Sequence, residues 1–211
     1  MLAPEDIELA GSALGYIPPP GEPLLGSELA PGDEIVLVPS SGLHANGASL
    51  ARLVASRLPA GYATPLASGS TLGEALLEPS LMYVALVERL LAAGMAPTYI
   101  SHVTGHGLLK LMRARRELTY RVRALPAVPE VLAFIAAQAA LDDRAAYQTL
   151  NMGTGLALYC AAGHGRDAVG VATGMGLAAV LAGQVEEGPR RVILEPLGVT
   201  YEGSELELTP R

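Results

Sequence analysis

The stretch Val36-Leu-Val-Pro-Ser-Ser-Gly-Leu-His-Ala-Asn-Gly-Ala-Ser-Leu50 decides how this chain of 211 residues folds. It continues an apolar run that starts at Glu34 and predicts a buried strand ending at Pro39. A loop of small and polar residues follows, and then a helical pattern formed by Leu50, Leu53, Val54 and Leu58. This order predicts an anion site, because the first backbone N–H groups of a helix lack partners and lie at its positive end.

The side chains of this loop suit recognition of an anion. Glycines let the backbone approach a ligand closely, and hydroxyl, amide and imidazole groups supply directional hydrogen bonds. We predict that the loop binds a phosphorylated ligand through Ser40, Ser41, Gly42, Asn46 and Gly47. His44 is the candidate catalytic residue, as a donor to an oxyanion or in proton transfer near neutral pH. The alternative is a capped strand–helix turn with nothing bound, since Ser and Asn are common N-caps.

A second loop repeats this pattern. Thr104, Gly105, His106 and Gly107 follow one predicted strand and precede a predicted short helix, so their backbone N–H groups can form an anion-binding nest. Asn151 is a third polar position, directly before another apolar run. It either joins the binding site or forms an Asx turn or a cap.

The histidine spacing does not predict a metal site. His102 and His106 are four residues apart, but they lie on a strand end and a Gly turn rather than on one helix face. No Cys, Asp or Glu stands in this motif as a third ligand. We expect His102 to be a polar anchor under the second loop and His164 to lie in an exposed turn.

Four segments, in this order along the chain, resemble the aminoimidazole ribonucleotide synthetase (phosphoribosylformylglycinamidine cyclo-ligase) family. Ser40-Ser-Gly-Leu-His-Ala-Asn-Gly47 resembles its SSGxHSNG signature, with Ala45 in place of Ser. Leu77-Glu-Pro-Ser-Leu-Met-Tyr-Val84 resembles L-x-P-T-R-I-Y-V, and His102-Val-Thr-Gly-His-Gly-Leu108 resembles A-H-x-T-G-G-G, with His106 in place of Gly. Tyr147-Gln-Thr-Leu-Asn-Met-Gly-Thr-Gly155 resembles M-Y-R-T-F-N-x-G-x-G. The resemblance runs from about residue 5 to residue 185 and covers the carboxyl-terminal half of that enzyme.

The resemblance implies an α+β fold, a layered α/β/α sandwich with a mixed sheet and a partly ferredoxin-like core. It divides the chain into residues 1–17, a remnant strand of a missing ATP-binding domain, residues 18–30, a linker, and residues 31–211, the synthetase carboxyl-terminal-like domain. It also brings the segment around Asn151 close to the Ser40–Gly47 loop. The family uses ATP and Mg²⁺ to close the imidazole ring of its product in purine biosynthesis, and binds both mainly through the other half. We therefore expect no cofactor on this chain alone, and no activity of the chain alone.

Three hypotheses remain open from the sequence. The chain is the substrate-side part of a synthetase; or it is a non-catalytic binding or regulatory module for a phosphorylated ligand; or it is another member of the same ATP-dependent superfamily, such as a thiamine-monophosphate kinase, a hydrogenase-maturation or a selenophosphate enzyme. The motif spellings favour the synthetase. The predicted strand Ile7–Ile17 would be an unpaired edge. We therefore expect a homodimer, or a partner chain that carries the amino-terminal half.

Composition narrows the class of protein. A formal net charge of −7 argues against a nucleic-acid partner. No apolar run reaches the ~20 residues of a membrane span, and the first residues lack a signal-peptide pattern, so we expect a cytoplasmic protein without a membrane partner. Cys160 lies in an apolar run and is expected to be an inert buried thiol. The basic cluster is either a solvated surface or a rim that attracts a phosphorylated ligand, and consists of Arg113, Arg115, Arg116, Arg121 and Arg123.

Periodicity and turn residues predict the remaining elements. The further predicted strands span residues 98–103, 119–123, 155–161, 179–185, 191–194 and 206–208. The further predicted helices span residues 80–94, 107–113, 128–140 and 143–150, and Thr71 to Glu74 resembles a capping box. The resemblance implies a helix over residues 166–176, although three glycines oppose it.

Overall fold

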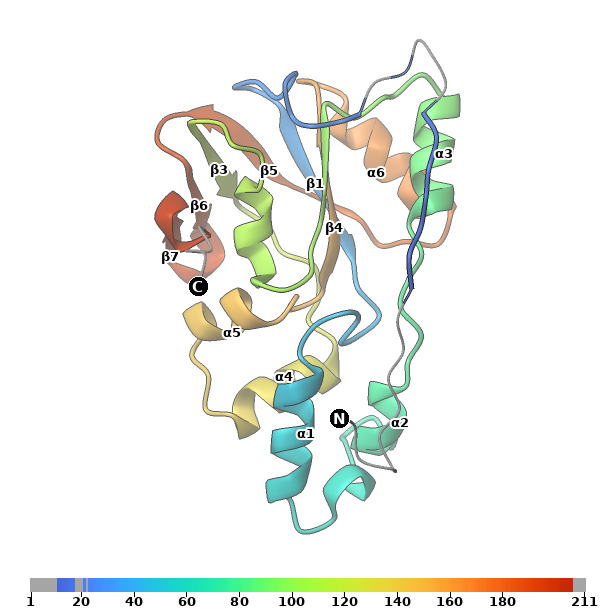
Figure 1. Ribbon diagram of the computed structural model, residues 1–211, viewed down its shortest axis with the longest axis vertical. Coiled ribbons are helices and arrows are strands. Elements are labelled where there is room, and N and C mark those ends of the chain that lie inside the picture. Colours follow the sequence, from blue (N-terminus) through green and yellow to red (C-terminus); the bar gives the residue numbers. More distant parts are fainter. Residues whose placement is uncertain (1–10, 18–20, 22, 207–211) are drawn as a thin grey trace.

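The fold is built around one mixed β-sheet. The structure, a computed structural model, describes residues 11–17, 21 and 23–206. Its strands lie in the order β2-β4-β1-β5-β3-β6-β7 (Figure 1). Neighbouring strands are antiparallel except for β3 and β6, which run parallel. The strands are β1 (Glu34–Pro39), β2 (Tyr99–His102), β3 (Leu118–Val122), β4 (Thr154–Cys160), β5 (Val180–Glu187), β6 (Arg191–Leu194) and β7 (Val199–Glu202).

Helices cover both faces of this sheet. The α-helices are α1 (Ala48–Arg57), α2 (Leu72–Leu76), α3 (Val84–Ala92), α4 (Glu130–Gln138), α5 (Asp143–Thr149) and α6 (Gly165–Gly174). The 3₁₀ helices are η1 (Gly61–Ala63), η2 (Gly107–Met112), η3 (Glu195–Leu197) and η4 (Gly203–Glu205). Helices α3 and α6 pack together on one face, η2 and α5 lie on the other, and α1, α2 and α4 gather beyond one end of the strands (Figure 1).

Two hydrophobic cores result, one on each face of the sheet. Alternate side chains of β1 enter different cores, because successive residues of a strand point to opposite faces. Ile35 and Leu37 join the larger core under η2 and α4, whereas Val36 and Val38 join the smaller core under α3 and α6. Every residue of β4 is buried, as expected for a central strand covered on both sides. The layered α+β fold predicted from the resemblance is confirmed.

Most predicted elements are present, with shifted ends. The capping box of α2 is formed, since Thr71 Oγ1 accepts from the Glu74 N–H and the Glu74 carboxylate accepts from the Thr71 N–H. Helix α6 exists despite its glycines; of these, Gly170 and Gly174 lie at open surface positions. Val54, predicted on the apolar face of α1, is buried, but Leu53 of the same predicted face is 45% exposed, and Ala51 and Ala55 are buried in its place.

One predicted boundary and two predicted strands differ from the structure. The helix expected near residue 80 begins at Val84, because a non-helical segment first crosses the loop end of β1. No strand includes Leu206, which follows η4, while β7 at Val199–Glu202 was not predicted; residues 207 and 208 lie outside the described part of the chain. Residues 11–17 are exposed and in no strand, and the rest of the predicted amino-terminal strand, residues 7–10, is not described.

The predicted linker is partly held by the domain. Leu29 is fully buried, and Arg116 donates hydrogen bonds to the carbonyls of Gly26 and Ser27. Among the described residues, no helix is both long and apolar enough to span a membrane.

Candidate functional site

The sheet topology brings the two predicted loops and the turn at Asn151 together at the same end of three adjacent strands. Strand β4 lies between β1 and β2 and is antiparallel to both. The carboxyl ends of β1 and β2 therefore flank the amino end of β4. The first loop (Ser40–Gly47), the second loop (Thr104–Gly107) and the turn at Asn151 start or end at these three strand ends.

Asn151 ties the first loop to this edge. Its buried Oδ1 accepts from Ser40 Oγ at 2.7 Å and from the Gly153 N–H at 3.0 Å. Its Nδ2 donates to the carbonyls of Gly42 at 2.8 Å and Leu43 at 3.1 Å. The expected proximity of Asn151 to the loop is thus present, together with the alternative Asx-type turn to Gly153. Because Ser40 and Asn151 are buried and hydrogen-bonded to protein, their side chains support the loop.

These bonds orient the backbone of the loop. A trans peptide holds its C=O and the next N–H on opposite sides, so the N–H groups of Leu43 and His44 point away from Asn151. Neither N–H has a hydrogen-bond partner among the described residues. His44 adopts a left-handed conformation with φ 56°, which is uncommon for a residue with a side chain. Successive free N–H groups around such a residue form the kind of concavity that binds anions.

Helix α1 begins next to these groups without a cap. Its N-cap residue is Gly47, at φ 106°, and no side chain hydrogen-bonds to the first turn. The first turn also contains no acidic residue. A Cβ on Gly47 would come within 2.7 Å of Leu150 Cδ2 and 2.8 Å of Leu43 Cδ1, and the φ of 106° is strained for any residue with a side chain, so glycine is favoured here. The positive end of the helix is therefore available to an anion.

The second loop meets the first through Asn46. Asn46 Nδ2 donates to the Thr149 carbonyl at 2.7 Å, and its Oδ1 lies against Gly105, 3.4 Å from where a Cβ would stand. The turn is closed by the Gly107 N–H, which donates to the Thr104 carbonyl at 3.1 Å. A Cβ on Gly107 would lie 2.1 Å from the Tyr147 carbonyl oxygen. This close approach explains the glycine.

His44 is held in one tautomer. The N–H groups of Ser41 and Leu81 donate to its Nε2 at 3.0 and 3.4 Å, so Nε2 is the acceptor and the proton resides on Nδ1. Ser41 Oγ lies 2.9 Å from the same nitrogen and donates to the Pro79 carbonyl. Burial, and secondarily the nearby His102, lower the pKa of His44. The neutral imidazole of His44 accepts hydrogen bonds at Nε2 and thereby stabilises the loop. Only its Nδ1–H remains to donate to a ligand.

Tyr83 is a member of this site that the sequence did not single out. Its hydroxyl donates to the Pro39 carbonyl at 2.8 Å, and burial raises its pKa. Its ring lies 6.3 Å from the His44 ring and 6.1 Å, edge-on, from the His102 ring. His102, the last residue of β2, is exposed, so the expectation of an anchor beneath the second loop is wrong. Tyr83 stands in the motif Leu77–Val84, which was a signal for its importance.

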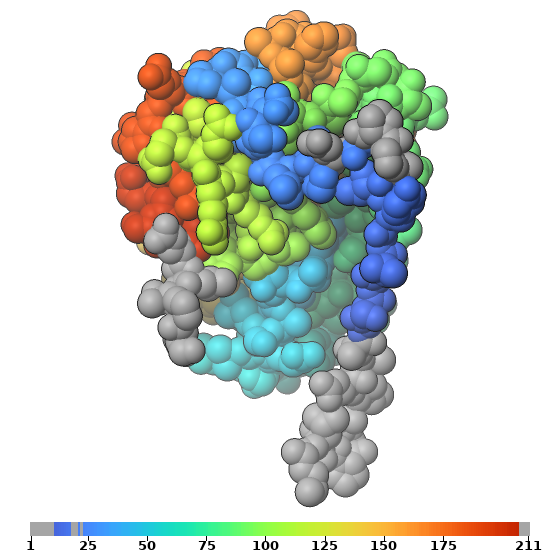
Figure 2. Space-filling model, turned by 45° about the horizontal axis from the view of Figure 1, so that its top comes forward, coloured from blue at the N-terminus to red at the C-terminus, as the bar shows by residue number. Residues whose placement is uncertain are grey.

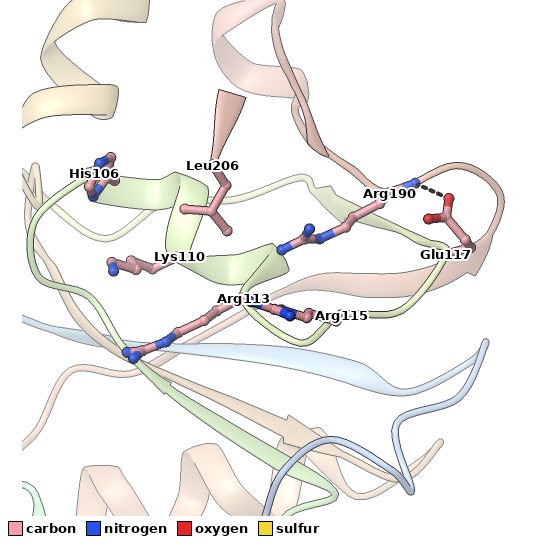
Figure 3. Close-up of a pocket in the computed structure, with 7 residues that line it drawn as sticks. All are labelled: His106, Lys110, Arg113, Arg115, Glu117, Arg190 and Leu206. Atoms are coloured by element: carbon pink, nitrogen blue, oxygen red, sulfur yellow. Dashed lines mark hydrogen bonds between the residues drawn. The ribbon is translucent and has the colours of Figure 1, made fainter. Parts of the chain in front are cut away.

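The predicted basic cluster does not stay together: Arg116 binds the carbonyls of Gly26 and Ser27, and the other four arginines form two groups. Arg121 and Arg123 form ion pairs with Glu186 and Glu195 on the sheet. Arg113 and Arg115 instead line a cleft of about 680 Å³ beside η2 (Figure 3). The full lining consists of His106, Lys110, Arg113, Arg115, Glu117, Arg190 and Leu206. His106, at φ 72°, thus belongs to the second loop and also lines this cleft.

The remaining candidates for chemistry are metal-ligating clusters and the thiol of Cys160. The described residues contain no group of three His, Cys, Asp or Glu side chains placed to hold a metal ion. Cys160 is buried at the end of β4, and burial, with smaller contributions from Glu34 and Asp33, raises its pKa to about 11. The expected inert character of this thiol agrees with that environment.

The amino-acid sequence is similar to a known domain family and to curated proteins. The family model described as AIR synthase related protein, C-terminal domain, matches residues 30–195. A phosphoribosylformylglycinamidine cyclo-ligase of Methanothermobacter thermautotrophicus is 32% identical over 159 residues, which are 74% of this chain and 45% of that protein. The protein of the same name from Lachnospira eligens is 35% identical over 164 residues, with 74% and 47% covered. The chain spans about half the length of the curated relatives it matches.

Solved structures share the fold. A hydrogenase maturation protein HypE superposes with a TM-score of 0.55 at 19% identity, over 92% of this chain and 59% of that one. Thiamine-monophosphate kinase from Stenotrophomonas maltophilia gives a TM-score of 0.54 at 22% identity, over 82% and 53%. At these identities the likeness concerns the architecture.

Proposed function

The chain belongs to the family of AIR synthase related C-terminal domains, and from this premise we propose that it binds a phosphorylated small molecule at the loop edge of its sheet. In this proposal it acts as the substrate-side domain in the ATP-dependent ring closure of formylglycinamidine ribonucleotide. The phosphate of the ligand sits at the amino end of α1.

The arrangement of the first loop carries this proposal. Asn151 fixes the carbonyls of Gly42 and Leu43, which turns the next two N–H groups away from it, while Gly47 leaves the start of α1 uncapped. An anion held there gains hydrogen bonds from fixed donors and the attraction of the helix dipole. The donors are ordered before the ligand arrives, so binding costs little further ordering.

The Mg²⁺ that the family uses together with ATP does not fit the described residues. Mg²⁺ requires oxygen ligands, usually carboxylates and phosphates, and no cluster of acidic side chains is available among the described residues. We therefore assign no step through ATP or Mg²⁺ to this domain. Its part in the reaction is to bind and orient the substrate, and the phosphoryl-transfer groups come from residues outside this sequence.

An apolar surface supports association with a partner that carries those groups. Leu77, Met82 and Val84 are 81%, 85% and 64% exposed just before and at the start of α3. Residues 11–17 run over the surface as an exposed segment, dark blue in Figure 2, and add Leu14 and Tyr16, at 102% and 81% exposure. So many large exposed apolar side chains in one region favour a protein interface. The partner is either a second copy or a chain with the ATP-binding half.

Ligand binding is tested with ribose 5-phosphate by isothermal titration calorimetry. Ala48 is an exposed residue in the first turn of α1, and Ala48→Glu places a carboxylate where the phosphate would bind. The variant should bind at least about tenfold more weakly, because like charges then compete for the same helix end. Ala48→Gln, of matched length but neutral, should retain most of the affinity. Equal binding by both variants would place the ligand elsewhere.

Catalysis is tested by an assay of ATP-dependent ring closure. The chain is assayed alone and after addition of the amino-terminal half of a full-length relative. Turnover only in the mixture supports the substrate-side role. Binding of the sugar phosphate without turnover in either case would instead assign a non-catalytic binding module.

A further inference from the structure

The cleft beside η2 concentrates positive charge on an acidic protein. Lys110, Arg113, Arg115 and Arg190 line it, against the single carboxylate of Glu117. The whole chain carries 14 basic and 21 acidic residues, so four cations around one cleft depart from its overall balance. Figure 3 shows Lys110 on η2, Arg113 and Arg115 following it, and Arg190 reaching in from the turn between β5 and β6.

Three arginines elsewhere in the fold, one on β3, one directly after it and one on α5, form ion pairs, whereas three of the cleft cations form none with the described residues. Arg121, Arg123 and Arg144 each bind a glutamate within the described part of the chain. In that same part, no carboxylate lies within ion-pair distance of Lys110, Arg113 or Arg115. The pKa of Lys110 is lowered, first by burial and then by the charge of Arg113, so these groups repel one another in the free protein.

Glu117, the acidic residue that lines the cleft, already has a hydrogen-bond partner within the protein. Glu117 accepts a hydrogen bond from the Arg190 N–H at 3.3 Å, and Arg190 Nε donates to the Met112 carbonyl at 2.9 Å. These bonds hold the far wall of the cleft in place. They leave Lys110, Arg113 and Arg115 as the groups that a ligand would neutralise.

We propose that this cleft is a second anion site, which binds a small molecule carrying two or more linked phosphate groups. Arginine guanidinium groups recognise phosphate oxygens with paired N–H donors, and lysine adds a point charge. A diphosphate or triphosphate carries more charge and more oxygens than a single phosphate, and can therefore pair with more of the cations that line this cleft of about 680 Å³. This volume is also that of a typical small-molecule site and is too confined for a nucleic-acid duplex.

The site is distinct from the one at the amino end of α1. Its lining comes from η2, the segment before β3, the turn before β6 and Leu206 after η4, and of these residues only His106 lies in a loop of the first site region. The proposal does not depend on the ring-closure role, because it needs no substrate at the first loop. His106, where the related family has glycine, places an imidazole at the boundary between the two sites.

The test is calorimetric titration with inorganic diphosphate in the absence of divalent cations. Wild-type protein should bind it saturably and more tightly than inorganic phosphate. Arg113→Gln and Arg115→Gln should each weaken binding about tenfold, as expected for loss of a charge-assisted hydrogen bond. Arg166→Gln, an exposed arginine on α6 across the sheet, removes the same charge and should leave the affinity unchanged. Circular dichroism confirms that each variant is folded.

Further arms separate the sources of the diphosphate and the two sites. Adenosine diphosphate that binds more tightly than inorganic diphosphate would identify a nucleotide, and equal affinities would identify the diphosphate itself as the recognised group. Ala48→Glu should not change diphosphate binding. No saturable binding, or equal loss in Arg166→Gln and the cleft variants, would overturn the proposal.

Discussion

Ser40 Oγ donates a 2.7 Å hydrogen bond to Asn151 Oδ1 and thereby joins the carboxyl end of β1 to the turn before β4. The two residues are 111 positions apart in the sequence and both are buried. Through Asn151 the bond also fixes the carbonyls of the first loop. The proposed phosphate site therefore depends on a buried polar pair that need not touch the ligand.

Asn151→Ala should destabilise the fold by about 2–3 kcal/mol, because the Ser40 hydroxyl and two loop carbonyls lose their partner in a buried place. Ser40→Ala should cost less, about 1 kcal/mol, since Asn151 keeps its other bonds. Urea denaturation of both single variants and the double variant measures the coupling. A coupling energy near zero would show that the bond is not formed in solution.

Much of this arrangement could be predicted from the sequence. The run Glu34–Val38, the small loop after it and the helical spacing from Leu50 onward predicted β1, the first loop and α1, since local patterns specify local structure. The ordered motifs placed Asn151 near that loop. The support role of Asn151 could not be predicted, because a list of polar residues does not say which oxygens meet across the sheet.

Other features lay beyond local patterns for physical reasons. In the sequence, Tyr83 is one aromatic residue in an apolar helical pattern. Only the packing of α3 on the sheet brings its hydroxyl within hydrogen-bond distance of the Pro39 carbonyl. The five arginines form one cluster in the sequence, yet Arg121 on β3 pairs with Glu186, whereas Arg113, directly after η2, lines the cleft. Glu186 and Arg190 come from a distant part of the chain, so the sequence could not show which cations are paired.

Gly107→Ala should be strongly destabilising, by about 3 kcal/mol or more. The new Cβ would lie 2.1 Å from the Tyr147 carbonyl oxygen and 2.6 Å from that of Leu150, and neither backbone group can move freely. The left-handed conformation, φ 49°, adds about 1 kcal/mol for a residue with a side chain. Gly94→Ala is the matched control: its φ is 72° and its Cβ would be in open space, so only the conformational cost applies. Thermal melts that shift equally for both variants would contradict the packing argument.

His44 should make stability depend on pH. Its pKa is lowered in the folded state, so the unfolded chain binds the proton more readily. Stability is therefore highest when His44 is neutral in both states, and it falls as the pH drops below the ordinary histidine pKa of about 6.5. Protonation of Nε2 would also oppose the Ser41 and Leu81 N–H groups.

The measurement compares urea midpoints above and below this pH. His44→Asn should flatten the dependence, whereas His164→Gln, at an exposed position before α6, should leave it unchanged. A wild-type protein whose stability does not fall on mild acidification would show that His44 is not buried as described.

Cys160 should react with thiol reagents only after unfolding. Its side chain is 5% exposed at the end of β4, and burial raises its pKa to about 11, so almost no thiolate exists at neutral pH. A disulfide-exchange reagent followed by absorbance should show negligible reaction with native protein and one equivalent in guanidinium chloride, because the chain contains a single cysteine.

The rate of Cys160 labelling at low denaturant then reports opening of the β4 end near α6, which packs on this core. Ala172→Gly, which removes a buried methyl from α6 in the same core and lowers helix propensity, should accelerate it. Fast labelling of the native wild-type protein would mean that the smaller core does not seal this end of the sheet.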